Sequence, residues 1–201
     1  MITIVDYGMG NSGSIQNMLK RIGVASVITG EAGEVARASK LILPGVGAFD
    51  RAMQHIDESG LRQVLDKKVL EERVPVLGIC LGMQLLTRSS EEGIRQGLGW
   101  IQAATRRLPA TPGLKIPHMG WNRVIPTRED PILKNFPEES RFYFVHSYAV
   151  EVDTASDSLL KATHGITFDA AVRHENIVGV QFHPEKSHRF GMLLFENFAG
   201  L

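Results

Sequence analysis

The feature that most limits how this chain can fold is the alternation of short apolar runs with segments of helical spacing in its first half. Four short, mainly apolar runs are residues 2–5, 24–28, 40–43 and 74–79. Between them, hydrophobic residues recur every three or four positions, which is the spacing of a helix with one buried face. Strands that alternate with helices form parallel sheets covered by those helices. The first half therefore predicts an α/β fold with a mainly parallel sheet.

The second half predicts antiparallel pairing. After about Gly97, short apolar runs are separated by Gly, Pro and Asn, and the expected strands are residues 99–106, 120–125, 141–150, 159–163, 170–173 and 177–181. A closing helix is expected over residues 187–198, whose apolar residues share one face. We expect a single domain, residues 1–201, in which an antiparallel extension follows the parallel sheet.

Charge and cysteine content exclude several classes of function. The 22 basic and 22 acidic residues balance, so no long-range field attracts nucleic acid or an anionic membrane. No apolar stretch approaches the roughly 18 residues of a membrane span, and the N-terminus lacks a signal-peptide pattern, so we expect a cytoplasmic protein. The one cysteine, Cys80, leaves no intramolecular disulfide and no multi-thiolate metal site. Cys80 is then either a buried core residue or a reactive thiol.

Two glycines flank this cysteine where a predicted strand meets a predicted helix, in Gly78-Ile79-Cys80-Leu81-Gly82. A tight strand-to-helix turn pushes the central side chain out of the sheet, and flanking glycines avoid collisions with the backbone. The helix N-terminus favours a thiolate at Cys80, and the N–H of Leu81 would stabilise an oxyanion. The motif alone fits a small buried residue at the end of a core strand equally well.

A base for such a thiol occurs in Gln181-Phe182-His183-Pro184-Glu185, directly after the apolar run 177–180. Pro184 discourages helix at His183, so His183 and Glu185 are expected to lie in extended chain and face the same side. Glu185 would orient the imidazole through one nitrogen while the other faces Cys80. The alternative is a surface histidine followed by an acid at the start of the last helix.

A glycine-rich loop follows the first strand. Gly8-Met9-Gly10-Asn11-Ser12-Gly13 matches the dinucleotide-binding fingerprint, with Glu31 or Glu34 about 20 residues further on. That interpretation predicts an oxidoreductase that binds NAD or FAD. The fingerprint is weak by itself and no second nucleotide-binding half follows, so we favour a loop at the edge of a ligand or partner site.

Six motifs together resemble the triad (class I) glutamine amidotransferases over essentially the whole chain. They are Asp6-Tyr7-Gly8-Met9-Gly10-Asn11, Pro44-Gly45-Val46-Gly47-Ala48-Phe49, Gly78-Ile79-Cys80-Leu81-Gly82-Met83-Gln84, Pro117-His118-Met119-Gly120-Trp121-Asn122, Phe144-Val145-His146-Ser147-Tyr148 and Gln181-Phe182-His183-Pro184-Glu185-Lys186-Ser187. The first and fourth are similar to those of the glutaminase subunits of imidazole glycerol phosphate synthases. The chain departs from the family at Ser12-Gly13, where an apolar and then a polar residue are more usual. The resemblance implies a three-layer, flavodoxin-like fold, with helices on both faces of a mixed, mainly parallel sheet.

The resemblance also implies the chemistry. Cys80 would attack the carboxamide of L-glutamine, His183 would carry the proton to the departing ammonia, and Glu185 would orient His183, with no cofactor and no metal. Residues implied to hold the substrate are Gly45, Gln84, His146, Ser147 and Tyr148.

A second oxyanion donor is implied in the segment Pro44–Gly47, at Val46 or Gly47, beside the donor of Leu81. Glycines permit the peptide rotations that such a loop requires, although the segment alone also fits an ordinary strand-to-helix turn. We expect the segment to change conformation before it aims an N–H at the oxyanion.

Ammonia in neutral water is almost entirely ammonium, which has no free electron pair, so a glutaminase serving synthesis must pass ammonia directly to a second site. By resemblance, that site lies in a separate (β/α)8-barrel cyclase subunit, and the heterodimer makes imidazole glycerol phosphate and aminoimidazole carboxamide ribotide in histidine synthesis. Candidate docking residues are Asn11, Trp121, Tyr143 and Lys186, each of which is otherwise a core aromatic or a solvated polar residue.

Three other functions stay open on the sequence. The nearest is the glutaminase of another triad amidotransferase, such as that of anthranilate or pyridoxal phosphate synthesis. A second is a catalytically idle regulatory scaffold, against which the full set of Cys80, His183 and Glu185 argues. The third is the nucleotide-binding oxidoreductase suggested by Gly8–Gly13.

Overall fold

A mixed sheet forms the centre of the computed structural model, which describes residues 1–110 and 112–201. Within these residues, ten strands join one sheet in the order β2-β1-β3-β4-β12-β11-β10-β7, with β9 paired to β11 and β5 paired to β9. The strands are β1 (Ile2–Val5), β2 (Ser26–Thr29), β3 (Leu41–Leu43), β4 (Val76–Ile79), β5 (Ala103–Arg107), β7 (Ile125–Pro126), β9 (Tyr148–Val152), β10 (Ser158–His164), β11 (Ile166–His174) and β12 (Ile177–Val180). The run from β2 to β12 is parallel, as the first half of the sequence predicted.

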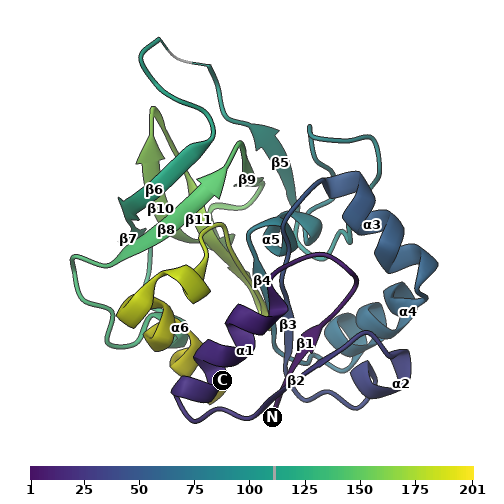
Figure 1. Ribbon diagram of the computed structural model, residues 1–201. Coiled ribbons are helices and arrows are strands. Elements are labelled where there is room, and N and C mark those ends of the chain that lie inside the picture. The colour runs from purple at the N-terminus through teal and green to yellow at the C-terminus, as the bar shows by residue number, and fades with distance from the viewer. Residues whose placement is uncertain (111) are drawn as a thin grey trace.

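Helices cover both faces of the parallel strands (Figure 1). They are α1 (Ser12–Arg21), α2 (Ala32–Val35), α3 (Phe49–Glu58), α4 (Leu61–Asp66), α5 (Leu81–Leu85) and α6 (His188–Gly200). Successive side chains of β1 face opposite helix layers, as the alternation of a strand requires. Ile4 packs with α1 and α6, whereas Val5 packs with α3, α4 and α5. The expected three-layer, flavodoxin-like α/β arrangement is confirmed.

Short helical turns complete the chain. They are the π-helical turn η1 (Lys67–Glu71) and the 3-10 turns η2 (Pro131–Leu133), η3 (Ala155–Asp157) and η4 (Pro184–Lys186). The helical segment that follows residue 48 is divided at Gly60, whose φ of 72° lies in the left-handed region. The helix expected from Leu81 is short, since α5 ends at Leu85.

The predicted strand over residues 141–150 is wrong in one respect, because two strands occupy that stretch. β8 (Arg141–His146) pairs with β6 (His118–Arg123) in a separate two-stranded sheet, whereas β9 pairs with β5 and β11. The chain passes from one sheet to the other at Ser147, whose carbonyl accepts from the N–H of Leu108 (2.9 Å). His146 and Ser147 interrupt the apolar run at this point, but two polar residues alone do not show that the chain changes sheets, which depends on tertiary pairing.

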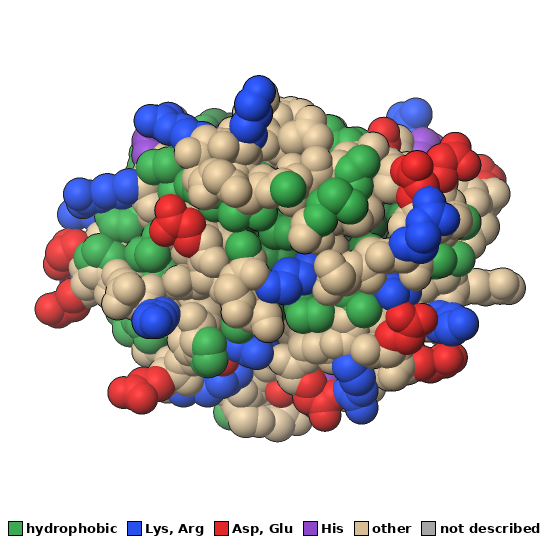
Figure 2. Space-filling view, turned by 90° about the horizontal axis from the view of Figure 1, so that it is seen from below, with side chains coloured by type: hydrophobic (Ala, Val, Ile, Leu, Met, Phe, Trp, Pro, Cys, Tyr) green, Lys and Arg blue, Asp and Glu red, His purple; other side chains and the backbone are tan. Residues whose placement is uncertain are grey.

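Surface charge follows the balanced composition. Figure 2 shows acidic and basic side chains interspersed over the lower face of the molecule. In the described part of the chain, the search for a helix long and apolar enough to cross a membrane found none.

The turn from β4 into α5 is pressed against neighbouring backbone at both of its glycines. A Cβ at Gly78 would lie 2.6 Å from the carbonyl oxygen of Gly82, and a Cβ at Gly82 would overlap the carbonyl oxygen of Leu43 in β3. Backbone cannot yield as a flexible side chain does, so these positions require glycine.

Substitution of Gly82 by alanine is expected to lower the free energy of unfolding by at least about 2 kcal/mol, because the added methyl group forces β3 and α5 apart. Gly13→Ala is the matched control, since nothing lies within 4 Å of a Cβ there and the residue is helical. The control should leave stability unchanged or raise it by up to about 1 kcal/mol. Urea denaturation measures both, and equal stability of the two variants would contradict the close approach.

Candidate active site

Cys80 occupies the turn between β4 and α5. Its backbone has φ 54° and ψ −109°, an unfavourable combination for a residue with a side chain. The conformation is held on both sides, because the N–H of Cys80 donates to the carbonyl of Val180 (2.8 Å) and its carbonyl accepts from the N–H of Gln84 (3.2 Å). This is the strained strand-to-helix turn that presents a nucleophile at the edge of a sheet.

His183 follows β12, the strand next to β4, and therefore lies at the same edge of the sheet as Cys80. Its backbone is extended (φ −102°, ψ 96°), as predicted. The expectation that Glu185 also lies in extended chain is wrong, because Pro184–Lys186 is a 3-10 turn, where proline is favourable at the first position. The turn nevertheless brings Oε1 of Glu185 to 2.7 Å from Nδ1 of His183, with both side chains buried.

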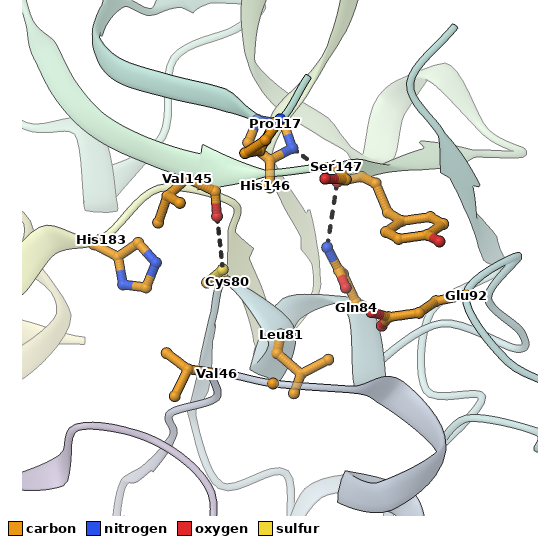
Figure 3. A pocket seen from close by; sticks show the side chains of 12 residues that line it. Val46, Cys80, Leu81, Gln84, Glu92, Pro117, Val145, His146, Ser147 and His183 are labelled. Atoms are coloured by element: carbon orange, nitrogen blue, oxygen red, sulfur yellow. Dashed lines mark hydrogen bonds between the residues drawn. The ribbon is translucent and has the colours of Figure 1, made fainter. Parts of the chain in front are cut away.

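The charge state of His183 is set by opposing effects. Burial favours the neutral ring, but the interactions of His183 with the Cys80 sulfur and the Glu185 carboxylate outweigh burial and raise its pKa to about 9. Among the described residues, Nε2 of His183 is buried without a hydrogen bond of standard geometry. Figure 3 shows the ring beside the sulfur of Cys80. At neutral pH, His183 is therefore an imidazolium, and it faces the Cys80 sulfur.

A cavity of about 350 Å³ opens over Cys80. It is lined by most of the predicted site residues, namely Val46, Gly47, Cys80, Leu81, Gln84, His146, Ser147, Tyr148 and His183. Glu185 lies behind His183, and Gly45 lies behind the wall, where a Cβ would come within 2.8 Å of Leu81 and of the Tyr7 hydroxyl. The volume suits a small polar molecule.

Two glutamines connect the cavity wall to the sulfur. Nε2 of Gln84 donates to the carbonyl of Tyr148 (3.3 Å) and to Oε1 of Gln181 (3.2 Å), and Nε2 of Gln181 lies 3.7 Å from the Cys80 sulfur. Gln181 is not among the site residues predicted from the sequence. The available signal was its place at the end of an apolar strand, two residues before His183, where a fully buried amide requires a partner.

Glu92 is a second cavity residue that was not predicted from the sequence. This acidic side chain lines the cavity, and its Oε2 accepts from the N–H of Phe49 (2.9 Å) at the start of α3. Glu92 lies in a loop next to another acid, Glu91, and no local pattern distinguishes the two. The structure thus adds a fixed negative charge to one wall of the cavity.

The segment Pro44–Gly47 follows β3 and borders the cavity beside Cys80. The hydroxyl of buried Tyr7 donates to the carbonyl of Pro44, while Val46 is exposed and Gly47 has a φ of 109°. Val46 and Leu81 lie on the same side of Cys80 in Figure 3. The glycine-rich loop packs against this segment, because a Cβ at Gly10 would lie 3.2 Å from Cβ of Pro44.

Three of the four candidate docking residues form one group at the surface, in which Trp121 and Lys186 are exposed and Tyr143 is half-buried. Trp121, on β6, stacks on His188 with centroids 5.6 Å apart and meets the Tyr143 ring edge-on at 6.3 Å. Nζ of Lys186 lies 5.7 Å from the centroid of Tyr143. Asn11 lies apart as the N-cap of α1, where its Oδ1 accepts from the N–H of Ser14 (3.3 Å), and α1 packs against η4.

The donor set of the described residues holds no group of three or more His, Cys, Asp or Glu side chains that could bind a metal ion. The site places the Cys80 sulfur, the His183 imidazolium and the Glu185 carboxylate next to one another, with a hydrogen bond between His183 and Glu185. That set supports nucleophilic attack on a carbonyl carbon followed by proton transfer to a leaving group.

Comparison with known proteins identifies the relatives of this chain. A family model described as glutamine amidotransferase class-I matches residues 3–200. The chain is 51% identical over 201 residues to imidazole glycerol phosphate synthase subunit HisH 2 of Pseudomonas aeruginosa, covering 100% of both chains. It is 52% identical over 198 residues to the subunit HisH 2 of Methanococcus maripaludis, covering 98% of each chain, and 48% identical over 202 residues to the subunit HisH of Bdellovibrio bacteriovorus, covering 99% of each.

Solved structures share the fold at lower identity. PurLQS from Thermotoga maritima superposes with a TM-score of 0.77 at 18% identity, with 99% of this chain and 97% of that chain covered. A structure described as a glutamine amidotransferase gives a TM-score of 0.78 at 18% identity, with 100% and 99% covered. The glutaminase domain of Trypanosoma brucei CTPS with bound acivicin gives 0.66 at 16% identity, with 99% and 93% covered.

Substitution of Glu185 by glutamine is expected to lower the pKa of His183 by at least about one pH unit, because a neutral amide no longer stabilises the imidazolium. The ring would then lose its proton at a lower pH than the value of about 9 in the native chain. Titration of the His183 ring by NMR measures this. Exposed Glu196→Gln is the control and should leave the pKa of His183 unchanged, whereas an unchanged value in Glu185→Gln would contradict the coupling.

Proposed function

The chain belongs to the class-I glutamine amidotransferase family, and from this premise we propose that it is the glutaminase subunit of an imidazole glycerol phosphate synthase. The observation that carries the proposal is the meeting of Cys80, His183 and Glu185 at one sheet edge, in a chain aligned from end to end with relatives that bear the name of that subunit.

The proposed reaction begins with attack of the Cys80 thiolate on the carboxamide carbon of L-glutamine. The tetrahedral adduct collapses when imidazolium His183 gives its proton to the nitrogen. The C–N bond then breaks, ammonia departs, and a thioester remains on Cys80. Neutral His183 then takes a proton from water, whose oxygen attacks the thioester carbon. The C–S bond breaks, glutamate is released, and the Cys80 thiolate and the His183 imidazolium are restored. Glu185 holds the ring through Nδ1 in both steps.

The oxyanion of each tetrahedral adduct needs hydrogen-bond donors. The N–H of Leu81, at the N-terminus of α5, is one proposed donor, since the first N–H groups of a helix have no partner within it. The second comes from Val46 or Gly47. Rotation of a peptide in this segment would aim its N–H at the oxyanion, and the positive φ of Gly47 marks a backbone that other residues rarely adopt.

The cavity wall suits the backbone end of glutamine. The carboxylate of Glu92 can pair with the α-ammonium group, and the segment from His146 to Tyr148 can present backbone N–H groups to the α-carboxylate. Gln84 is held by two acceptors, Tyr148 and Gln181, so its remaining amide oxygen has a fixed direction. Recognition of both the α-ammonium and the α-carboxylate groups would favour binding of free glutamine over glutamine residues within peptides.

A partner is part of the proposal, because ammonia released into water is protonated before it reacts. We assign the partner to a (β/α)8-barrel cyclase subunit, and the complete synthase acts as a lyase that yields imidazole glycerol phosphate and aminoimidazole carboxamide ribotide. Trp121, Tyr143 and Lys186 form the surface group described above. This group is next to His183, because the N–H of His183 donates to the carbonyl of Tyr143. Docking there would cover the route by which ammonia leaves.

The alternative of another triad amidotransferase, serving anthranilate or pyridoxal phosphate synthesis, has less support. The three relatives described above all bear the name of the imidazole glycerol phosphate synthase subunit and align over at least 98% of both chains. Reconstitution with each candidate partner separates these functions.

We expect the purified chain to hydrolyse glutamine slowly and a barrel cyclase with its ribonucleotide substrate to raise kcat at least roughly 100-fold, since one oxyanion donor is worth about that factor. Glutamate release measures both states, and Cys80→Ala in the complex is the control that should show no release. Equal rates with and without the cyclase would contradict the partner-dependent oxyanion loop. No release under any condition would contradict the glutaminase assignment itself.

A separate prediction concerns the proposed docking residues Trp121, Tyr143 and Lys186. Trp121→Ala should weaken binding of the cyclase by roughly tenfold or more, because tryptophans that become buried on binding contribute much of the binding free energy of an interface. Leu70→Ala is the matched control, since Leu70 is 46% exposed and Trp121 is 47% exposed, but Leu70 lies on η1. Calorimetric titration gives both dissociation constants, and equal losses for the two variants would exclude β6 from the interface.

A further inference from the structure

A row of hydrogen bonds runs beneath β6 toward the glutamine cavity. Nδ2 of Asn122 lies 2.9 Å from the carbonyl of Thr163 and 3.2 Å from Nε2 of His118, and Nδ1 of His118 lies 2.9 Å from Nε2 of His146. Nδ1 of His146 then lies 2.7 Å from the carbonyl of Tyr148. His118 and His146 are 3% and 5% exposed. Neither histidine takes part in the proposed proton transfers.

The direction of every bond in this row is fixed by its two ends. A carbonyl only accepts, so Asn122 must donate to Thr163 through Nδ2, and that same NH2 group faces Nε2 of His118. At the other end, the carbonyl of Tyr148 requires a proton on Nδ1 of His146. If both rings are neutral, each has its single proton on Nδ1, and each bond has one donor and one acceptor.

Burial keeps both rings neutral. It lowers the pKa of His118 to about 4, aided by the nearby His164, and the pKa of His146 to about 3. The bond of His146 to Tyr148 favours the charged ring, but burial outweighs that bond, and His118, His164 and His183 add repulsion. The Nδ1–H form is the less common tautomer of free histidine, so the two carbonyl ends select it.

The row does not stop at Tyr148. The same carbonyl accepts from Gln84, which also donates to Gln181, and Nε2 of Gln181 faces the Cys80 sulfur. Tyr148 is thus the point where the histidine row meets the substrate wall. Movement of His146 would displace the acceptor that fixes Gln84.

We propose that His118 and Asn122 are positioning residues for glutamine binding, which hold neutral His146 against the Tyr148 carbonyl and so fix the substrate wall formed by residues 146–148 and Gln84. This inference rests on the proposed glutaminase function. It adds two residues of β6 that do not touch the substrate cavity themselves, one of which, Asn122, is the chain neighbour of the docking residue Trp121.

The competing explanation is that His118 is simply a flat core ring. It stacks between Phe144, with centroids 4.8 Å apart, and His164, with centroids 4.2 Å apart. A packing role requires the ring, whereas a positioning role requires the N–H at Nδ1. Two substitutions of His118 separate these requirements, because the packing role and the positioning role predict opposite orders of their effects on KM for glutamine.

His118→Phe keeps a stacking ring and removes the donor, and His118→Asn removes the ring but keeps an NH2 group close to the place of Nδ1. In the complex with the cyclase, we expect His118→Phe to raise KM for glutamine roughly fivefold to tenfold with a smaller change in kcat. His118→Asn should keep KM within about twofold of the native value, even if it melts at a lower temperature. The reverse order, with Asn worse than Phe in KM, would overturn the proposal.

NMR of the ¹⁵N-labelled full chain tests the hydrogen-bond row without any catalytic readout. His118 and His146 should both carry their proton on Nδ1 and show no titration between about pH 5.5 and 8. A proton on Nε2 of either ring, or titration in that range, would overturn the proposal.

Failure of the proposed function is distinguishable from failure of this inference. If no partner elicits glutamine hydrolysis, the rate at which acivicin labels Cys80 of the free chain replaces KM as the readout. Slower labelling in His118→Phe than in His118→Asn would support the positioning role, and equal labelling would overturn it.

Discussion

The parallel pairing of β4 with β12 is the constraint on which the rest of the site depends. Its register sets Ile79 opposite Val180, so the residues that follow each strand emerge together at the carboxyl edge of the sheet. Cys80 turns into α5 there, and its N–H is tied to the carbonyl of Val180. Because about 100 residues separate the two strands, only the sheet can bring the thiol to the imidazole, and the edge of a parallel sheet is where ligands bind in such folds.

The site carries two kinds of local cost in free energy. Cys80 has a positive φ, and among the described residues, Nε2 of His183 and Oε2 of Glu185 are buried without hydrogen-bond partners. An unsatisfied buried polar atom costs about 1–3 kcal/mol. Such costs concentrate at functional positions, where consistency between sequence and structure is given up for reactivity. The tightly packed glycines of the β4–α5 turn leave that turn no way to relax, so the strain persists at Cys80.

The motifs around Cys80 and His183 are recognisable locally, but the position of the two side chains at one sheet edge depends on the pairing of β4 with β12. The sequence predicted the parallel half well, because that half depends on periodicity and on turn residues that act locally. It failed where tertiary pairing decides. The polar pair His146-Ser147 does not by itself indicate that the run from Arg141 to Val150 changes sheets, and the extended chain expected at Glu185 is a 3-10 turn. Gln181 and Glu92 were missed because their importance lies in what they face, which a linear pattern does not record.

The two halves of the molecule contribute different parts of the site for the proposed reaction. In that proposal, the parallel half supplies the thiol, the imidazole and the Leu81 donor on a rigid edge, whereas β8 and β9, with the residues between them, would form the wall that contacts the substrate. β6 contacts that wall through β8, and its side chains alternate. Its outward face carries Trp121, and its inward face carries His118 and Asn122. A partner that shifts β6 would therefore alter substrate binding through hydrogen bonds while the strands holding the nucleophile stay fixed.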